Sequence, residues 1–248
     1  MKPEMILPPL AGMLLAPLAL GIVNRTKAVF AGRRGAPLLQ TYFDLAKLLR
    51  KGAVYSRTTT WLFRAAPAIG LACMLVALAI VPMGKIPALL AFPGDIFLLA
   101  YTLGMSRFAT VLAALDTGSA FEGMGASREV QFSAVAEIGF IAGLVTLALV
   151  VGRFSLTEML GGLSFASWGA WGPFLALVAA ALFFVFLAEN CRIPVDDPNT
   201  HLELTMIHEV MILDHSGVDL AFILYGASLK FWVLGSILVQ IPASAVDG

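Results

Sequence analysis

The sequence predicts an all-α integral membrane protein that crosses the bilayer with about six helices. Apolar residues make up 59% of its 248 residues and charged residues only 13%, whereas about a quarter of the residues in soluble domains are charged. Apolar runs of roughly twenty residues recur, which is the length that crosses a hydrocarbon core about 30 Å thick. Because these runs are continuous and do not alternate, and because backbone groups in lipid must bond internally, helices are favoured over a β-barrel.

Six spans are predicted in order along the chain. They lie at about Ile6–Val23, Ala65–Pro82, Asp95–Leu115, Val130–Val151, Pro173–Ala188 and Asp219–Ile241. The first could be mistaken for a secretory signal, but its apolar part is longer than the about 7–15 residues of such signals, so we interpret it as a retained span. The whole chain, 1–248, is then a single membrane domain.

Basic residues orient the spans. Nine of the sixteen lysines and arginines fall in the first connector, 24–64, whereas the connector 83–94 contains only Lys85. Because positive charge collects on the cytoplasmic side, the first connector and every second one after it are predicted to be cytoplasmic. The connectors 116–129 and 189–218 therefore lie inside, and both termini lie outside.

The first connector contains a predicted amphipathic helix between Pro37 and Leu49. Leu38, Tyr42, Leu45 and Leu49 follow one another at spacings of four, three and four, which places them on one helical face. Two interpretations are open at this point. The helix either lies in the membrane interface or forms the wall of a site beneath a docked partner.

Three charged residues fall inside the predicted spans, Arg107, Glu137 and Lys230, and Glu189 lies where the fifth span ends. A charge at membrane depth is costly unless it is paired or hydrated, so each is a candidate for function. Glu137 could carry protons in a relay, or it could form a static pair that holds helices together. Arg107 and Lys230 are interpreted as structural counter-charges.

The last predicted connector, 189–218, is acidic and holds every histidine of the chain. Its carboxylates are Glu189, Asp196, Asp197, Glu203, Glu209 and Asp214, and its histidines are His201, His208 and His215. From Asn199 onward a helix is plausible, either as a polar face that meets water or a partner, or as a carrier of acids on a proton path.

No metal site and no nucleic-acid partner are expected for this chain. On a helix, histidines seven residues apart stand about 10 Å from each other, too far to share one metal. Cys73 and Cys191 are too few and too far apart for a metal cage, so no iron–sulfur cluster is expected in this chain. The net charge of zero gives no argument for nucleic acid.

Three segments resemble motifs of the subunit 1 family of respiratory complex I, whose bacterial members are called the H subunit. The segment AENCRIPVDDPNTHLE matches at Glu189, Arg192, Pro194, Asp196, Pro198 and Glu203, and Ser216–Gly217 resembles the Ser-Gly that closes the loop of the family. RRGAPLLQTYFDLAKL, from Arg33, and GASREVQFSAVAE, from Gly125 to Glu137, resemble the first two inner-loop motifs. The stretch before Ser216 and the segment LDTGSAFEGMGASRE are similar to the membrane subunits of group 4 [NiFe]-hydrogenases, such as hydrogenase-4 component C and the formate hydrogenlyase membrane subunit.

The resemblance implies an anchor in the prokaryotic cytoplasmic membrane on which a peripheral redox arm docks. The Ni–Fe centre and iron–sulfur clusters would lie in partners, a hydrogenase large subunit and an iron–sulfur small subunit, beside antiporter-like membrane subunits. By this resemblance Glu137, Glu189, Asp196 and Glu203 couple redox events to proton or sodium movement, and Glu209 of the same acidic connector is a further candidate for this role. Arg192, with Arg107 and Lys230, would hold carboxylates in place, and Arg33, Arg34, Asp44 and Arg128 would serve docking, as would the segment from Glu122 to Glu129.

Three alternatives remain beside this interpretation. The chain could be the quinone-site H subunit of complex I, with a quinone cavity at the helix Leu38–Leu49. It could be a purely structural anchor. A stand-alone transporter is disfavoured because the sequence shows no internal repeat. The family usually has eight spans, so the last two would be encoded elsewhere or absent from this variant.

Overall fold

The predicted all-α membrane fold is confirmed. The computed structural model describes residues 3–192, 195 and 207–245, and in these ranges six helices are long and apolar enough to cross a membrane. They are α1 (Leu7–Phe30), α3 (Trp61–Ile80), α4 (Asp95–Asp116), α5 (Ala120–Val151), α7 (Phe165–Glu189) and α9 (Gly217–Ala243). Four short elements complete the described chain: η1 (Pro3–Ile6), α2 (Gln40–Leu49), α6 (Leu156–Gly162) and α8 (His208–Met211).

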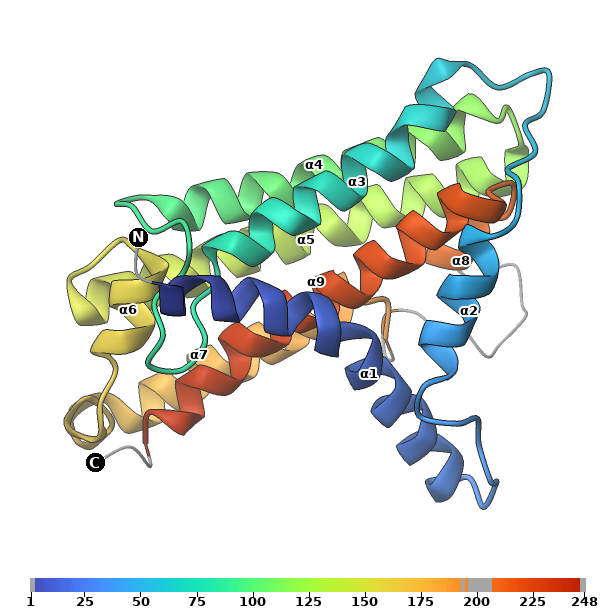
Figure 1. The fold of residues 1–248 in the computed structure, drawn as a ribbon. Coiled ribbons are helices and arrows are strands. Elements are labelled where there is room, and N and C mark those ends of the chain that lie inside the picture. Colours follow the sequence, from blue (N-terminus) through green and yellow to red (C-terminus); the bar gives the residue numbers. More distant parts are fainter. Residues whose placement is uncertain (1–2, 193–194, 196–206, 246–248) are drawn as a thin grey trace.

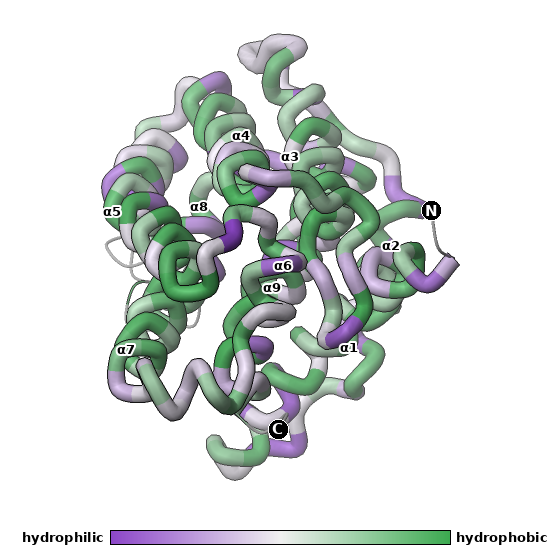
Figure 2. Tube along the Cα trace, turned by 90° about the vertical axis from the view of Figure 1, so that its left-hand side faces the viewer, coloured by the Kyte–Doolittle hydropathy of each residue, from purple (hydrophilic) through white to green (hydrophobic). Residues whose placement is uncertain are grey.

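The six spans form one bundle with two different ends (Figure 1). Both termini and α6 lie at one end, which we call the terminal end. The opposite end carries α2, α8 and the beginnings of α3 and α9, and we call it the connector end. Along the spans the chain is mostly hydrophobic, as the green tubes of Figure 2 show.

Four spans begin earlier than the sequence predicts: α3 and α9 by four and two residues, and α5 and α7 by ten and eight. Helix α5 begins at Ala120 and not at Val130, so most of the predicted connector 116–129 is helical. Hydropathy misses the first helical turns of α5 because they contain the polar residues Glu122 and Glu129. Both side chains face inward and are buried. Helix α7 begins at Phe165 and not at Pro173, with a kink at Trp171, where the backbone leaves helical geometry shortly before the proline.

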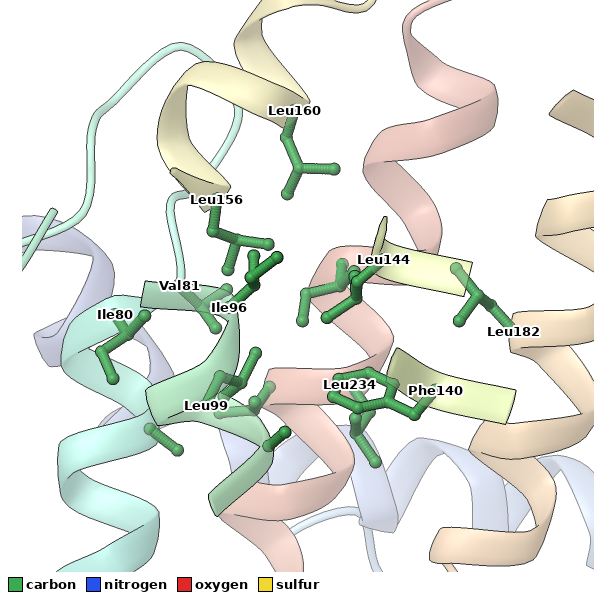
Figure 3. Packing of buried hydrophobic residues seen from close by; sticks show 14 of the residues in the cluster. Ile80, Val81, Ile96, Leu99, Phe140, Leu144, Leu156, Leu160, Leu182 and Leu234 are labelled. Carbon is green, nitrogen blue, oxygen red and sulfur yellow. The ribbon is translucent and has the colours of Figure 1, made fainter. Parts of the chain in front are cut away.

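An apolar core fills the terminal half of the bundle. Leu99 of α4, Leu144 of α5 and Leu234 of α9 pack in one cluster with residues of α3, α6 and α7 (Figure 3). Leu99 is fully buried and Leu144 is 1% exposed. One carboxylate lies beside this core: Asp95, where it accepts hydrogen bonds from the Ser155 hydroxyl (2.9 Å) and the Leu156 amide (2.7 Å). These bonds fasten the start of α4 to the start of α6.

Polar contacts hold the connector end. The Thr60 hydroxyl caps α3 by accepting from the Leu62 amide (3.2 Å), while the Thr60 amide donates to Asp116 at the end of α4 (2.7 Å). Gly217 opens α9 with φ +55°, and a Cβ there would lie 2.5 Å from the Gly52 carbonyl oxygen. Glycine is therefore required where the first connector crosses the start of α9.

Candidate functional site

Four ionisable side chains from four spans meet in the connector half of the bundle. Arg107 of α4 places its Nη1 3.2 Å from Oε1 of Glu189, the last residue of α7. Its other terminal nitrogen, Nη2, lies 3.8 Å from Oε2 of Glu137 on α5. Lys230 of α9 approaches the second oxygen of Glu189 at 3.8 Å. The order Glu137, Arg107, Glu189, Lys230 alternates in sign, and we call these four residues the charged cluster.

Burial differs along the charged cluster. The side chains of Glu189 and Arg107 are 6% and 10% exposed, whereas that of Glu137 is 37% exposed. Glu137 lies against the α4 backbone at Gly104, where an added Cβ would meet both carboxylate oxygens at 3.8 Å. Buried charges of opposite sign hold one another in place, and removing one partner leaves the other uncompensated.

A cavity of about 480 Å³ lies beside the charged cluster, enclosed by α1, α2, α3, α4 and α9 and by the segment around α8. Thr41, Asp44 and Leu45 of α2 line one side of it. Its acidic, basic and histidine lining residues are Asp44, Arg107, Glu129, Glu189, Arg192, His208, Glu209 and Lys230. The cavity thus combines a mainly apolar lining with charged groups that come from connectors and spans alike.

Glu137 is not among the residues that line the cavity. Its neighbours Ala134 and Ile138 on α5, and Met105 on α4, are exposed. The Glu137 carboxylate therefore opens on the outer surface of the chain. Because Arg107 contacts both Glu137 and Glu189, a single guanidinium connects the cavity with that surface.

The structure distributes the sequence-predicted site residues over several places. Asp44, Glu189, Arg192 and Glu209 line the cavity together with Arg107 and Lys230. Arg33 and Arg34 are exposed in the connection between α1 and α2, and Arg128 is partly exposed on α5. Asp196, Glu203 and His201 lie outside the described residues. The Nε of Arg192 makes no hydrogen bond to any described residue.

Sequence reasoning missed Glu129 as a cavity residue and placed both Glu122 and Glu129 on a docking connector. They are 2% and 8% exposed, so neither offers a free surface on this chain. Glu122 accepts a hydrogen bond from the Asp214 amide (3.3 Å), and Glu129 lies 4.0 Å from the Cys191 sulfur. The sequence did contain a signal that both carboxylates face inward. Residues seven apart lie on one helical face, and the small residues Gly125 and Ala126 between them are buried on the same helix.

The two described histidines have different surroundings. His208 lies at the cavity, and burial, followed by the charges of Lys230 and Arg192, lowers its pKa to about 4. His215 is stacked on Phe63 with ring centroids 3.9 Å apart, and burial lowers its pKa. Both imidazoles are therefore neutral at pH 7. Within the described residues no group of three histidine, cysteine or acidic side chains could hold a metal ion.

Comparisons with known proteins agree on one family. A family model described as NADH dehydrogenase matches residues 5–242. Hydrogenase-4 component C of Escherichia coli K12 is 33% identical over 230 residues, which cover 92% of this chain and 71% of that protein. Formate hydrogenlyase subunit 4 of the same strain is 29% identical over 92% of this chain and 73% of its own length. The H subunit of NADH-quinone oxidoreductase from Anaplasma phagocytophilum is 25% identical over 252 residues, which cover 93% of this chain and 72% of that protein.

A solved structure has the same fold. A chain of the membrane-bound sulfane sulfur reductase, an archaeal respiratory membrane complex, superposes with a TM-score of 0.78 and 19% sequence identity. The match covers 96% of the present chain and 77% of the other. At this identity the likeness concerns the fold alone.

Proposed function

Because this chain belongs to the NADH dehydrogenase family, whose members here are membrane subunits of hydrogenase and complex I-type complexes, we propose that it anchors and couples a [NiFe]-hydrogenase similar to formate hydrogenlyase. In this proposal the chain docks the peripheral redox arm and links electron transfer to the movement of protons or sodium ions. The Ni–Fe centre and the iron–sulfur clusters belong to the large and small partner subunits.

One observation carries the proposal: Arg107 contacts a cavity carboxylate, Glu189, and an outward-facing carboxylate, Glu137. A proton arriving at either carboxylate removes its charge and leaves Arg107 to interact with the other one alone. Because the pairs are partly buried, these interactions are weakly screened. The charge state of the cavity is thereby linked to the charge state of the outer surface.

The proposed coupling begins at the docked arm. A redox event there changes the charge near the connector end, where Glu189 and Glu209 line the cavity. Glu189 changes its protonation in response, and Arg107 transmits the change to Glu137. Antiporter-like partner subunits that cover Glu137 would continue the path. Asp196 and Glu203 remain assigned to this path on their motif alone.

We assign the connector end to the cytoplasmic side of a prokaryotic inner membrane. Nine of the sixteen basic residues lie in the segment 24–64, which comprises the end of α1, the connection with α2 and the start of α3, and cytoplasmic connectors are enriched in lysine and arginine. The proposed docking surface comprises Arg33, Arg34, Asp44 and Arg128. The connectors 24–64, 116–129 and 189–218 belong to this side within one membrane domain, 1–248.

The test uses the complex purified through a tag on this chain and reconstituted in vesicles. Hydrogen evolution from reduced viologen, nickel content and the ion gradient are measured together. Glu137→Gln and Glu189→Gln are each expected to retain hydrogen evolution while the gradient falls at least tenfold. Glu158→Gln is the matched control, because Glu158 is an exposed carboxylate of α6 that pairs with Arg153.

The outcomes separate coupling from simple anchoring. A normal gradient in both variants would remove the coupling role of the charged cluster. Loss of assembly alone, with a normal gradient per assembled complex, would identify a structural anchor. A complex with neither nickel nor hydrogen evolution would reject the hydrogenase assignment.

A quinone-site subunit is the second candidate, and the cavity beside α2 favours it. Thr41 and Leu45 line the cavity on the helix at which the sequence analysis places a quinone cavity. Leu45→Trp would fill part of this space without changing a charge. Quinone reduction that is lost in this variant, in a complex without nickel, would support the candidate, whereas unchanged hydrogen evolution in the same variant would oppose it.

A further inference from the structure

Helix α2 has two faces of different chemistry. Thr41, Asp44 and Leu45 line the cavity on one face. Phe43, Ala46, Lys47 and Arg50 follow one another at helical spacings of three, one and three, and together with Lys51 they border a depression on the opposite side. We call these five residues the outer face of α2.

The outer face is exposed and positively charged. Lys47, Arg50 and Lys51 are all exposed, and no carboxylate borders the depression. The acid of the helix, Asp44, lies on the cavity side and accepts a hydrogen bond from the Gln40 side chain (2.8 Å). Three cations therefore stand together without an acidic neighbour among the residues of this face.

Apolar side chains adjoin these cations. Phe43 is 59% exposed and Leu49 is 54% exposed. The Tyr42 hydroxyl donates to the Leu14 carbonyl of α1, so α2 lies directly against a membrane span. Helix α2, which is not a span, runs across the direction of α3, α4, α5 and α9 at the connector end (Figure 1). A helix with this position and composition lies at the boundary between headgroups and acyl chains.

We propose that the outer face of α2 binds an anionic phospholipid of the adjacent leaflet. Lys47, Arg50 and Lys51 would contact its phosphate group, and Phe43 with Leu49 would contact its acyl chains. Charge complementarity identifies the ligand, because anionic lipids gather basic side chains at the membrane surface. The apolar neighbours distinguish a lipid from a free phosphate ion, which would gain nothing from them.

Lipid binding here would also affect the cavity. A single helix of ten residues separates the lipid from Thr41 and Leu45. A bound lipid would hold that helix against α1 and α9, and would thereby keep the cavity wall in place. Lipid binding at α2 does not depend on which redox partner docks. This proposal can therefore hold even if the proposed hydrogenase function is wrong.

The test measures lipid retention by the intact complex. The complex is purified in detergent and titrated with phosphatidylglycerol or phosphatidylcholine, and bound lipid is counted by native mass spectrometry. The triple variant Lys47→Gln/Arg50→Gln/Lys51→Gln should bind phosphatidylglycerol on the order of a hundredfold more weakly, since each cation contributes roughly fivefold. Lys85→Gln/Arg153→Gln, with two exposed cations at the terminal end, should bind like the parent.

Three outcomes would overturn the proposal. Unchanged phosphatidylglycerol binding in the triple variant would remove the site. Equal displacement of the lipid by inorganic phosphate would show an ion site without lipid selectivity. Unchanged lipid binding with loss of the peripheral arm would show that this face docks a protein. Should the triple variant fail to assemble, Arg50→Gln alone is expected to lose about fivefold, and its failure to do so would count equally against the proposal.

Discussion

The two halves of the bundle treat a buried carboxylate differently. In the terminal half, Asp95 is fully buried and receives hydrogen bonds from neutral donors of its own chain. In the connector half, Glu189 is nearly as buried but faces two cations and a cavity. The hydrogen bonds of Asp95 satisfy its carboxylate and fix α4 against α6. The arrangement around Glu189 leaves room for the charge to change, which is what the proposed coupling requires.

The same contrast appears in polar groups that lack partners. Within the described residues, the buried polar atoms without a hydrogen bond include Oε2 of Glu122, Nε of Arg192 and both ring nitrogens of His215, all at the connector end. Buried polar groups of this kind are uncommon in folded proteins and are expected to be costly. Over the described ranges, unpaired buried polar groups therefore lower the stability of the connector half more than that of the terminal half.

The largest expected effect comes from removing the shared anion. Glu189→Ala leaves Arg107 and Lys230 without their common partner, and breaking a buried pair in this way costs about 3–5 kcal/mol of unfolding free energy. Titration of the chain in mixed micelles with a denaturing detergent measures the loss. The second change Lys230→Met should restore part of it. Glu158→Ala, which breaks an exposed pair, should cost less than about 1 kcal/mol, and equal losses would contradict the comparison.

A loss of similar kind but smaller size is expected in the apolar core. Leu144→Ala should cost about 3 kcal/mol, because the cavity it leaves cannot close fully. Leu144 is 1% exposed, whereas Leu177 on α7 is 69% exposed and serves as the control. The same detergent titration applies. A Leu177→Ala variant that loses as much as Leu144→Ala would show that the exposed helical surfaces are packed as tightly as the core.

Acid should weaken the connector half alone. The pKa of His208 is lowered to about 4 from the ordinary 6.5, so below pH 6.5 the unfolded chain takes up a proton that the folded chain refuses. Stability is therefore complete above pH 6.5 and falls as the pH decreases toward 4, by at most about 1.4 kcal/mol per unit. By about pH 5 the contribution of His208 to this loss is about 2 kcal/mol, and His208→Gln should remove that contribution while the one from His215 remains.

Hydrogen exchange locates this acid effect. All three histidines lie at 201, 208 and 215, so amides around α8 should lose protection at about pH 5 after correction for the intrinsic rate. Amides of α6 at the terminal end should keep theirs. Uniform loss over both ends would contradict a local origin.

The smallest effect concerns a helix cap at the connector end. Thr60→Ala removes the oxygen that accepts from the Leu62 amide and that also donates to Asp116 (2.9 Å), and losing such a cap costs about 1 kcal/mol. Ser119 precedes α5 without a capping hydrogen bond, so Ser119→Ala is the matched control and should be neutral. Thermal unfolding in detergent distinguishes the two variants, and an equal shift in both would argue against the cap.

Hydropathy predicted the existence of the six spans because each must present about twenty mostly apolar residues to cross the lipid. It placed the start of α5 too late because Glu122 and Glu129 interrupt the apolar run while facing the inside of this chain. An average over a window cannot distinguish an inward carboxylate from an outward one. The pattern of α2 put Leu45 on an apolar face but did not indicate that Asp44 would line the cavity beside it.

The charged residues of the site could be predicted one at a time but not as pairs. Arg107, Glu137, Glu189 and Lys230 stood out because each is a charge at or near membrane depth. Their partners follow from how four helices rotate about their axes, which depends on side-chain packing across the whole bundle. No spacing in the sequence indicates that Arg107 would contact two carboxylates from different helices.

The outward exposure of Glu137 has a consequence for the life of the protein in the cell. Under the proposed function, a newly inserted copy without its partner subunits would expose Glu137, paired on one side with Arg107, to the hydrocarbon of the bilayer, where a charged side chain is costly. Burial beneath a neighbouring subunit removes that cost. An orphan copy would thus differ from an assembled one in the charge that it exposes to lipid.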